Sequence, residues 1–161
     1  MSYRSITGAF VLNRPLSVNQ AEYLKAFYDI KHRARNTNVR YLEEIEHTQI
    51  RTAPDVNLPV GLEGEFLITK TSDYLLPGGR HPYSMPEMWC PWLIHSDKQR
   101  LIWDNDTRTP HYIEWVEYFI EKFFLRWGYT LNGYVDVNKE DFTKVRVTAK
   151  ANHLITAKLD G

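Results

Sequence analysis

The sequence lacks most of the features that place a protein in a class. It has one cysteine among 161 residues, so no internal disulfide can form. Its amino terminus has neither the charged start nor the apolar stretch of a secretion signal, which indicates a cytoplasmic protein. No apolar run approaches the roughly 18 residues that a membrane-spanning helix needs. We therefore expect no membrane partner.

An excess of charge of one sign is also missing. Twenty Lys and Arg residues balance twenty Asp and Glu residues, so the formal net charge at pH 7 is zero. Such a balance creates no overall field that attracts nucleic acid or an anionic membrane. Any electrostatic function must therefore come from local clusters of charge.

Motifs that bind metals or phosphates are absent. The six histidines stand at 32, 47, 81, 95, 111 and 153, and no pair of His or Cys residues has the short spacing of a metal site. The glycines of LPGGRHP, at 76–82, lack the preceding strand and the following Lys-Ser/Thr of a phosphate-binding loop. We expect no metal, no cofactor and no catalytic residue that a motif identifies, which leaves enzymatic activity uncertain.

The chain does contain enough apolar surface for a core. Hydrophobic residues make up 43% of it and aromatic residues 14%, close to the usage of ordinary globular proteins. A chain of this length normally forms one domain. We therefore expect residues 1–161 to be a single domain.

Residue spacing predicts an α+β fold, a mainly antiparallel sheet with two principal helices packed on it. Strands are expected where apolar residues run together or alternate with polar ones, at 5–12, 65–70, 89–94, 100–103, 129–138, 144–149 and 153–159. Amphipathic helices are expected at 18–34 and 110–127. Ser17 and Gln20 are spaced as a capping box, and Thr109 as the N-cap of the second helix.

The second predicted helix is apolar on most sides. Pro110 suits its first position, and Gly128 suits its end. Its polar stripe is narrow and consists of Glu114, Glu117 and Glu121. A helix of this composition is expected to be covered on more than one side.

Residues 88–106, MWCPWLIHSDKQRLIWDND, hold three of the five tryptophans and the only cysteine. Cys90 and His95 suggest a thiol nucleophile, but a strand at 89–94 would direct them to opposite faces. A buried cysteine that acts as a small apolar side chain is the preferred interpretation. Some of the large aromatic residues are expected to face a partner. The predicted partner-binding side chains are Trp92, His95 and Trp103 in this segment and Tyr112 shortly after it.

A second candidate region is basic. Five potential cations stand within ten residues: Lys31, His32, Arg33, Arg35 and Arg40. Several donors on one segment can bind phosphates or an acidic protein surface. The alternative is the solvated end of a helix, where cations face the partial negative charge of the helix terminus. We predict that Lys31, Arg33, Arg35 and Arg40 bind a ligand or partner.

Several segments together resemble a known family. They are WCPW at 89–92, LIWD at 101–104, HYIEWVEYFIEKFF at 111–124 and WGYTLNGYV at 127–135, with fainter likeness in GAFVLNRPLSVNQAEYLKAF and LPVGLEGEF. The chain is similar to a family of small uncharacterised proteins encoded by bacteriophages and other mobile elements. Relatives carry a longer glycine-rich insert between Thr69 and Pro86. The resemblance implies a phage setting in the cytosol of a host cell, and it implies no activity.

Three functions remain open. The leading hypothesis is a non-enzymatic accessory protein that binds and modulates a host factor, or sequesters a nucleotide-like ligand, in counter-defence or host takeover. The second is a small nucleotide-directed enzyme in which His95 or His111 works with Asp104 as acid and base. The third is a nucleic-acid-binding module, which the basic segment permits and the neutral net charge disfavours. Each is compatible with a homo-oligomer.

Overall fold

The computed structural model describes residues 3–38, 50–72, 74–105 and 109–159. Its contacts divide the chain into two compact units. One, called here the sheet unit, joins Met1–Leu16 to Pro91–Gly161, and the other, the loop unit, is Ser17–Cys90. The single-domain expectation stays a prediction.

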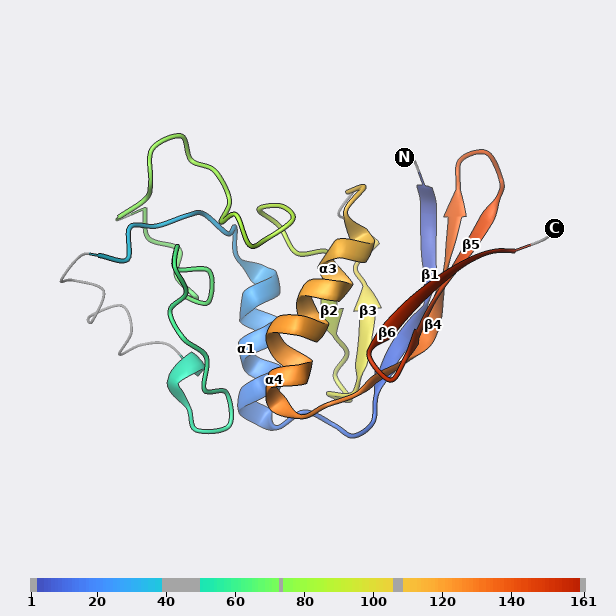
Figure 1. Ribbon diagram of the computed structural model, residues 1–161, viewed down its shortest axis with the longest axis horizontal. Helices are drawn as coiled ribbons and strands as arrows, with labels where there is room; N and C mark the ends of the chain where they lie inside the picture. Colours follow the sequence, from blue (N-terminus) through green and yellow to red (C-terminus); the bar gives the residue numbers. More distant parts are fainter. Residues whose placement is uncertain (1–2, 39–49, 73, 106–108, 160–161) are drawn as a thin grey trace. The chain divides into compact units, whose positions relative to one another are not determined.

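The sheet unit is built on six antiparallel strands (Figure 1). In chain order they are β1 (Tyr3–Leu12), β2 (Trp92–Ile94), β3 (Arg100–Trp103), β4 (Leu131–Lys139), β5 (Lys144–Lys150) and β6 (His153–Leu159). Their order across the sheet is β2-β3-β1-β4-β5-β6. Together with the helices this confirms the predicted α+β class. The alternating burial of β5, where Val145, Val147 and Ala149 are buried, shows why period-two spacing predicted these strands.

The hairpin of β2 and β3 is confirmed in part. Trp92 pairs with Trp103 and Ile94 with Leu101 across the predicted turn. The strand begins at Trp92 and not at residue 89. Pro91 directly precedes it, at a position where a residue without a backbone N–H costs no ladder hydrogen bond. Pro91 still accepts through its carbonyl, from the N–H of Asp104 over 3.1 Å.

The long helix of the sheet unit has three parts: α3 (Tyr112–Phe119), the π-helical turn η2 (Ile120–Phe124) and α4 (Leu125–Trp127). Gly128 ends it in the left-handed region, with φ of 78°, as predicted. The start was predicted too early, because His111 occupies the N-cap position and Thr109 Oγ1 instead accepts from the His111 N–H over 3.0 Å. The narrow stripe of exposed carboxylates is confirmed, since Glu114, Glu117 and Glu121 are all exposed.

The loop unit contains α1 (Val18–Asp29) and the short 3-10 turn η1 (Ile50–Thr52). The predicted capping box is present, because Ser17 Oγ accepts from the Gln20 N–H and Gln20 Oε1 accepts from the Ser17 N–H. The helix ends at Asp29, five residues before its predicted end, and Ile30 is already extended with φ of −113° and ψ of 155°. The tyrosine hydroxyl of Tyr23 donates to the carbonyl of Phe66 over 2.7 Å, which ties α1 to the loops that follow it.

The strand predicted at 65–70 does not form. Gly61 and Gly64 have φ of 90° and 71°, and both bend the chain. The N–H of Gly64 bonds to Gly61, and that of Leu67 bonds back to Gly64, as in successive turns. The apolar run is therefore buried in turns, with Phe66 and Leu67 inside.

No helix among the described residues is both long enough and apolar enough to cross a membrane.

Candidate anion-binding pocket

The basic segment that follows α1 is extended, not helical. Backbone hydrogen bonds hold it in place, from the N–H of His32 to the carbonyl of Met88 over 2.7 Å and from the N–H of Ala34 to that of Arg80 over 2.9 Å. Arg35 forms an isolated antiparallel bridge with Leu75. These contacts replace the helical bonds that the segment would otherwise make. The interpretation as a solvated helix end is therefore wrong.

This conformation decides where the cations lie. Side chains two residues apart share a side in an extended chain, whereas in a helix they point about 200° apart. Lys31, Arg33 and Arg35 are each separated by two, so they form one row. All three line the same small pocket, which we call the basic pocket. Its complete lining is Ile30, Lys31, His32, Arg33, Arg35, Gly64, Glu65, Leu67, Thr69 and Pro82.

The three cations differ in burial. Lys31 is exposed, Arg33 is half-buried, and Arg35 is only 3% exposed. The Nε atom of Arg33 is buried and has no hydrogen-bond partner in the part of the chain that the structure describes. A buried N–H without an acceptor is costly.

His32 contributes no positive charge to this pocket at neutral pH. Its side chain is 3% exposed, and burial lowers its pKa from 6.5 to about 4. The ring donates from Nε2 to the carbonyl of Phe27 over 2.8 Å and packs against the Phe27 ring at 4.1 Å. His32 is therefore a neutral structural residue. Of the five potential cations in this segment, His32 is thus uncharged at neutral pH.

Two carboxylates fix the loops around the pocket. Glu63 forms an ion pair with Arg80, whose guanidinium lies 3.6 Å from the centre of the Tyr83 ring. The hydrogen bond from Arg80 lowers the pKa of the Glu63 carboxyl. Glu65 is 8% exposed and accepts from Ser84 Oγ over 2.8 Å. These bonds hold residues 60–67 against residues 80–84, so the pocket wall is already in place.

The pocket is small and mainly polar. Its free space is about 10 Å³, close to the size of one water molecule. Guanidinium groups bind carboxylate and phosphate oxygens in a fixed planar geometry, and Lys adds a mobile point charge. Three basic side chains and one carboxylate line it, so its formal charge favours an anion. The free space therefore admits one oxygen of an anionic group.

The predicted aromatic side chains lie elsewhere, in the sheet unit, and three are buried. Trp92 is 1% exposed, Trp103 5% and Tyr112 6%. The expectation that these three face a partner is wrong, because each packs inside the unit. The Trp92 ring lies 5.6 Å from Phe10 and 5.2 Å from Trp103. Trp89, which belongs to the loop unit, is the tryptophan of the segment 88–106 that does reach the surface, at 47% exposure.

The polar candidates also separate. His95 stands in the β2–β3 turn, partly exposed, with Asp97 3.5 Å away and Arg100 3.2 Å away. Asp97 accepts from the backbone of Gln99, which holds the pKa of its carboxyl well below the usual value. This pattern is typical of a turn that an aspartate stabilises. Arg40, also predicted to bind, lies outside the described residues.

The residues proposed for acid and base chemistry have other contacts. His111 lies 3.7 Å from Glu114 on the same helix turn, and the backbone N–H of Asp104 bonds to Pro91. Within the described ranges no cluster of three His, Cys, Asp or Glu side chains is arranged to hold a metal ion. Cys90 forms no disulfide and is 1% exposed. Its predicted burial is confirmed.

Sequence reasoning found the three cations and missed the wall opposite them. Gly64 and Thr69 lie about thirty residues further along the chain, and only tertiary contacts bring them to the pocket. One local signal was present. In KHRAR the basic residues alternate with His and Ala, which is the period of an extended chain and not of a helix. This alternation places the basic residues on one side only where the segment is extended.

Comparisons with protein-family models, curated proteins and solved structures give no match to this chain. The resemblance to phage-encoded proteins therefore stays a prediction.

Proposed function

We propose that this protein is a binding protein that uses the basic pocket to hold an anionic group on the surface of a protein partner. The observation that carries this proposal is the one-sided row of Lys31, Arg33 and Arg35 in a small polar pocket. Oriented donors of this kind favour carboxylate or phosphate oxygens. The wall fixed by Glu63 and Arg80 means that little rearrangement is needed on binding.

The size of the pocket favours a macromolecular partner over a free nucleotide. Small-molecule sites usually enclose most of the surface of their ligand, in cavities of about 300–1,000 Å³. The basic pocket, with about 10 Å³ of free space, admits one oxygen of a terminal group. The remaining binding energy must come from the surface around it, which a protein partner can cover. Neutral net charge over the chain disfavours long nucleic acids.

The resemblance to phage and mobile-element proteins suggests what the partner is. An accessory protein of that setting acts on its host, so we propose an acidic or phosphorylated host factor as the partner. Modulation by occupancy, in counter-defence or host takeover, requires no catalytic group. The buried positions of Trp92 and Cys90 are consistent with structural roles for both.

The proposal is tested with defined anionic probes. Titration calorimetry compares a Glu-rich peptide, the same peptide carrying one phosphoserine, and ATP, at about 50 and 200 mM salt. We expect the phosphopeptide to bind most tightly and ATP most weakly. Arg33→Glu should weaken peptide binding by about tenfold or more, because it replaces an attractive charge by a repulsive one. Its thermal unfolding should remain near that of the unmodified protein.

Lys25→Glu provides the matched control. Lys25 is an exposed cation on α1 of the same unit, and it does not line the pocket. If Arg33→Glu and Lys25→Glu lose the same peptide affinity, the effect comes from the overall charge and not from the basic pocket. If ATP binds more tightly than both peptides, the ligand is a nucleotide and the proposal of a protein partner is wrong. Arg35→Glu is avoided, because a carboxylate at a 3% exposed position would unfold the unit.

A further inference from the structure

The last strand of the sheet has a free edge. β6 forms one end of the strand order, and its seven residues are exposed or half-exposed along their whole length. Proteins usually protect such edges with proline, with bulges, with charges or by keeping the strand short. The opposite edge, β2, is three residues long. β6 has no proline, and its register with β5 is continuous from Lys150 to Lys144.

The turn before β6 determines which backbone groups face outward. Ala151 and Asn152 both have positive φ, of 49° and 70°, which is typical of a two-residue type I′ turn. Lys150 and His153 then form the hydrogen-bonded pair that closes the hairpin. Pairs alternate from there, so His153 and every second residue after it bond to β5. The N–H and C=O groups of Leu154, Thr156 and Lys158 therefore point to the free edge.

The side chains of these three residues share the helix-covered face. Leu154 lies opposite Ala149, Thr156 opposite Val147 and Lys158 opposite Val145, and these three β5 residues are buried. Cross-strand neighbours point to the same face of a sheet. Thr156 and Lys158 are nevertheless exposed, as is Ile155, at 56%, on the other face. The edge lacks the cover that β4 and β5 have.

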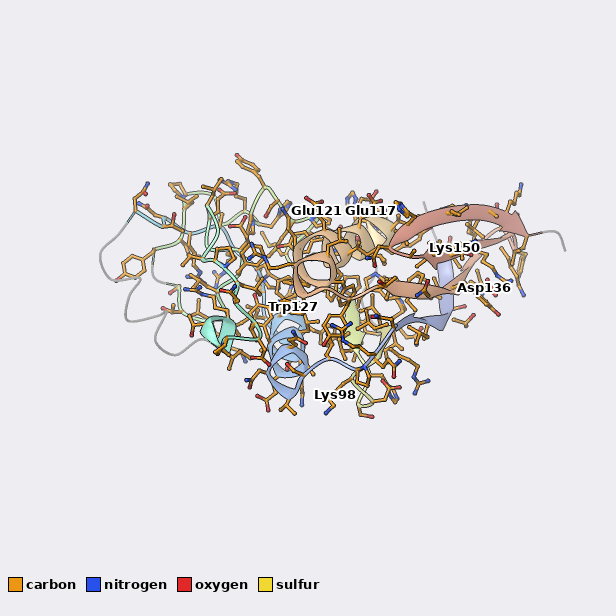
Figure 2. The ribbon with its side chains drawn as sticks, turned by 60° about the horizontal axis from the view of Figure 1, so that its bottom comes forward. Lys98, Glu117, Glu121, Trp127, Asp136 and Lys150 are labelled. Carbon is orange, nitrogen blue, oxygen red and sulfur yellow. The ribbon has the colours of Figure 1, made fainter. Side chains whose placement is uncertain are left out.

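An acidic groove adjoins the first residues of β6. It has a volume of about 430 Å³. Glu117 and Glu121, four residues apart, project from one side of the helix (Figure 2). Lys122 is 3.5 Å from Glu121. Leu125, 57% exposed, adds apolar surface. The complete lining is Glu117, Ile120, Glu121, Leu125, Asn152, His153 and Leu154.

We infer that β6 pairs antiparallel with β6 of a second copy of this chain, around a two-fold axis at Thr156. The outward-facing residues then pair as Thr156 with Thr156 and Leu154 with Lys158 of the second copy. This register matches every outward backbone group of one strand to one of the other. The axis is perpendicular to the sheet, so each side chain keeps its face.

Charge complementarity selects the second copy as the occupant. In this register Lys158 of the second copy lies beside Leu154, at the wall of the groove that holds Glu117 and Glu121. Symmetry repeats the contact, so two lysines meet two pairs of carboxylates. On the other face Ile155 lies beside Ala157 of the second copy, and its exposed side chain is covered. A basic strand from another protein would meet the same groove, but it would leave Lys158 without an acidic neighbour.

Sedimentation velocity over a range of concentrations tests this inference. The unmodified protein is expected to show a species of twice the mass of one chain. Thr156→Pro removes an outward N–H and should weaken the dimer by about tenfold or more, because symmetry counts the loss twice. Lys158→Glu should also weaken it, and combining Lys158→Glu with Glu117→Lys should restore pairing. Lys98→Glu, the same charge change in the β2–β3 turn, should have no effect.

The other outcomes overturn the inference. A single chain at every concentration would exclude the dimer. A dimer that persists unchanged in Lys158→Glu would place the interface elsewhere, even if Thr156→Pro did not fold. The protein could also stay monomeric and bind a lysine-rich β-strand peptide, with binding lost in Glu117→Lys. In that case the partner of β6 is a basic strand of another protein and not a second copy. None of these variants changes the basic pocket, so the proposed function is tested separately.

Discussion

The indole nitrogen of Trp92 donates a hydrogen bond to the backbone carbonyl of Tyr112 over 3.0 Å. This bond joins the first residue of β2 to the first residue of α3 inside the sheet unit. Both side chains are buried, at 1% and 6% exposure. An indole N–H that finds a partner when buried is a structural feature. The aromatic segment therefore anchors the helix start to the hairpin.

Trp92→Ala should destabilise the protein by about 3–5 kcal/mol, because it empties a large core site and removes the indole hydrogen bond to the Tyr112 carbonyl. Urea unfolding followed by circular dichroism measures the change. Trp89→Ala is the control, since that side chain is 47% exposed and its loss should change stability by less than about 0.5 kcal/mol. Equal effects in the two variants would contradict the assignment of Trp92 to the core.

His32 should make stability depend on pH between about 6.5 and 4. Its pKa is lowered to about 4 by burial, so the unfolded chain binds a proton in this range and the folded chain does not. Stability is therefore full above pH 6.5 and falls as the pH decreases, by up to about 3 kcal/mol for a single group. Below pH 4 both states are protonated at this site, and the loss stops.

The measurement for His32 is the free energy of unfolding at pH 7 and at pH 4.5. The variant His32→Gln retains a donor for the Phe27 carbonyl and does not titrate. The difference between the two proteins cancels the contributions of all other groups. If both lose the same stability between these pH values, His32 is not the neutral buried residue described above.

Removing the cap of α1 should cost about 1 kcal/mol, the usual effect at a helix N-cap. In Ser17→Ala the N–H of Gln20 loses its acceptor. Asp55 loses a donor as well, since Ser17 Oγ donates to its Oδ2 over 2.5 Å and thereby lowers the pKa of that carboxyl. Ser17→Thr retains the hydroxyl and should recover most of the stability. Thermal unfolding measures the stability of both variants. If Ser17→Ala is as stable as the unmodified protein, the cap does not stabilise the helix.

Cys90 should react slowly with a thiol reagent in the native protein and rapidly in urea. The thiol is 1% exposed, and a buried cysteine behaves as a small apolar side chain. Iodoacetamide labelling followed by mass spectrometry gives both rates. Native labelling as fast as that of the unfolded chain would return the thiol nucleophile to consideration.

Much of the sheet could be predicted from the sequence, because side chains of a strand alternate between its two faces and this period is visible in the residues. The alternation in 144–149 and 153–159 predicted β5 and β6, and both form. Ser17 with Gln20 and Gly128 predicted helix limits, because capping and left-handed geometry depend on neighbouring residues. These features need no knowledge of distant contacts.

The sequence by itself also determined that Lys31, Arg33 and Arg35 stand two residues apart. Only the tertiary structure decided that they form a one-sided row. Hydrogen bonds to Met88 and Arg80 keep the segment extended after Asp29, where local preference would have continued the helix. In the same way, the sequence could not say which of Trp89 and Trp92 is buried. That choice depends on packing against partners far along the chain, which put Trp92 inside and left Trp89 on the surface.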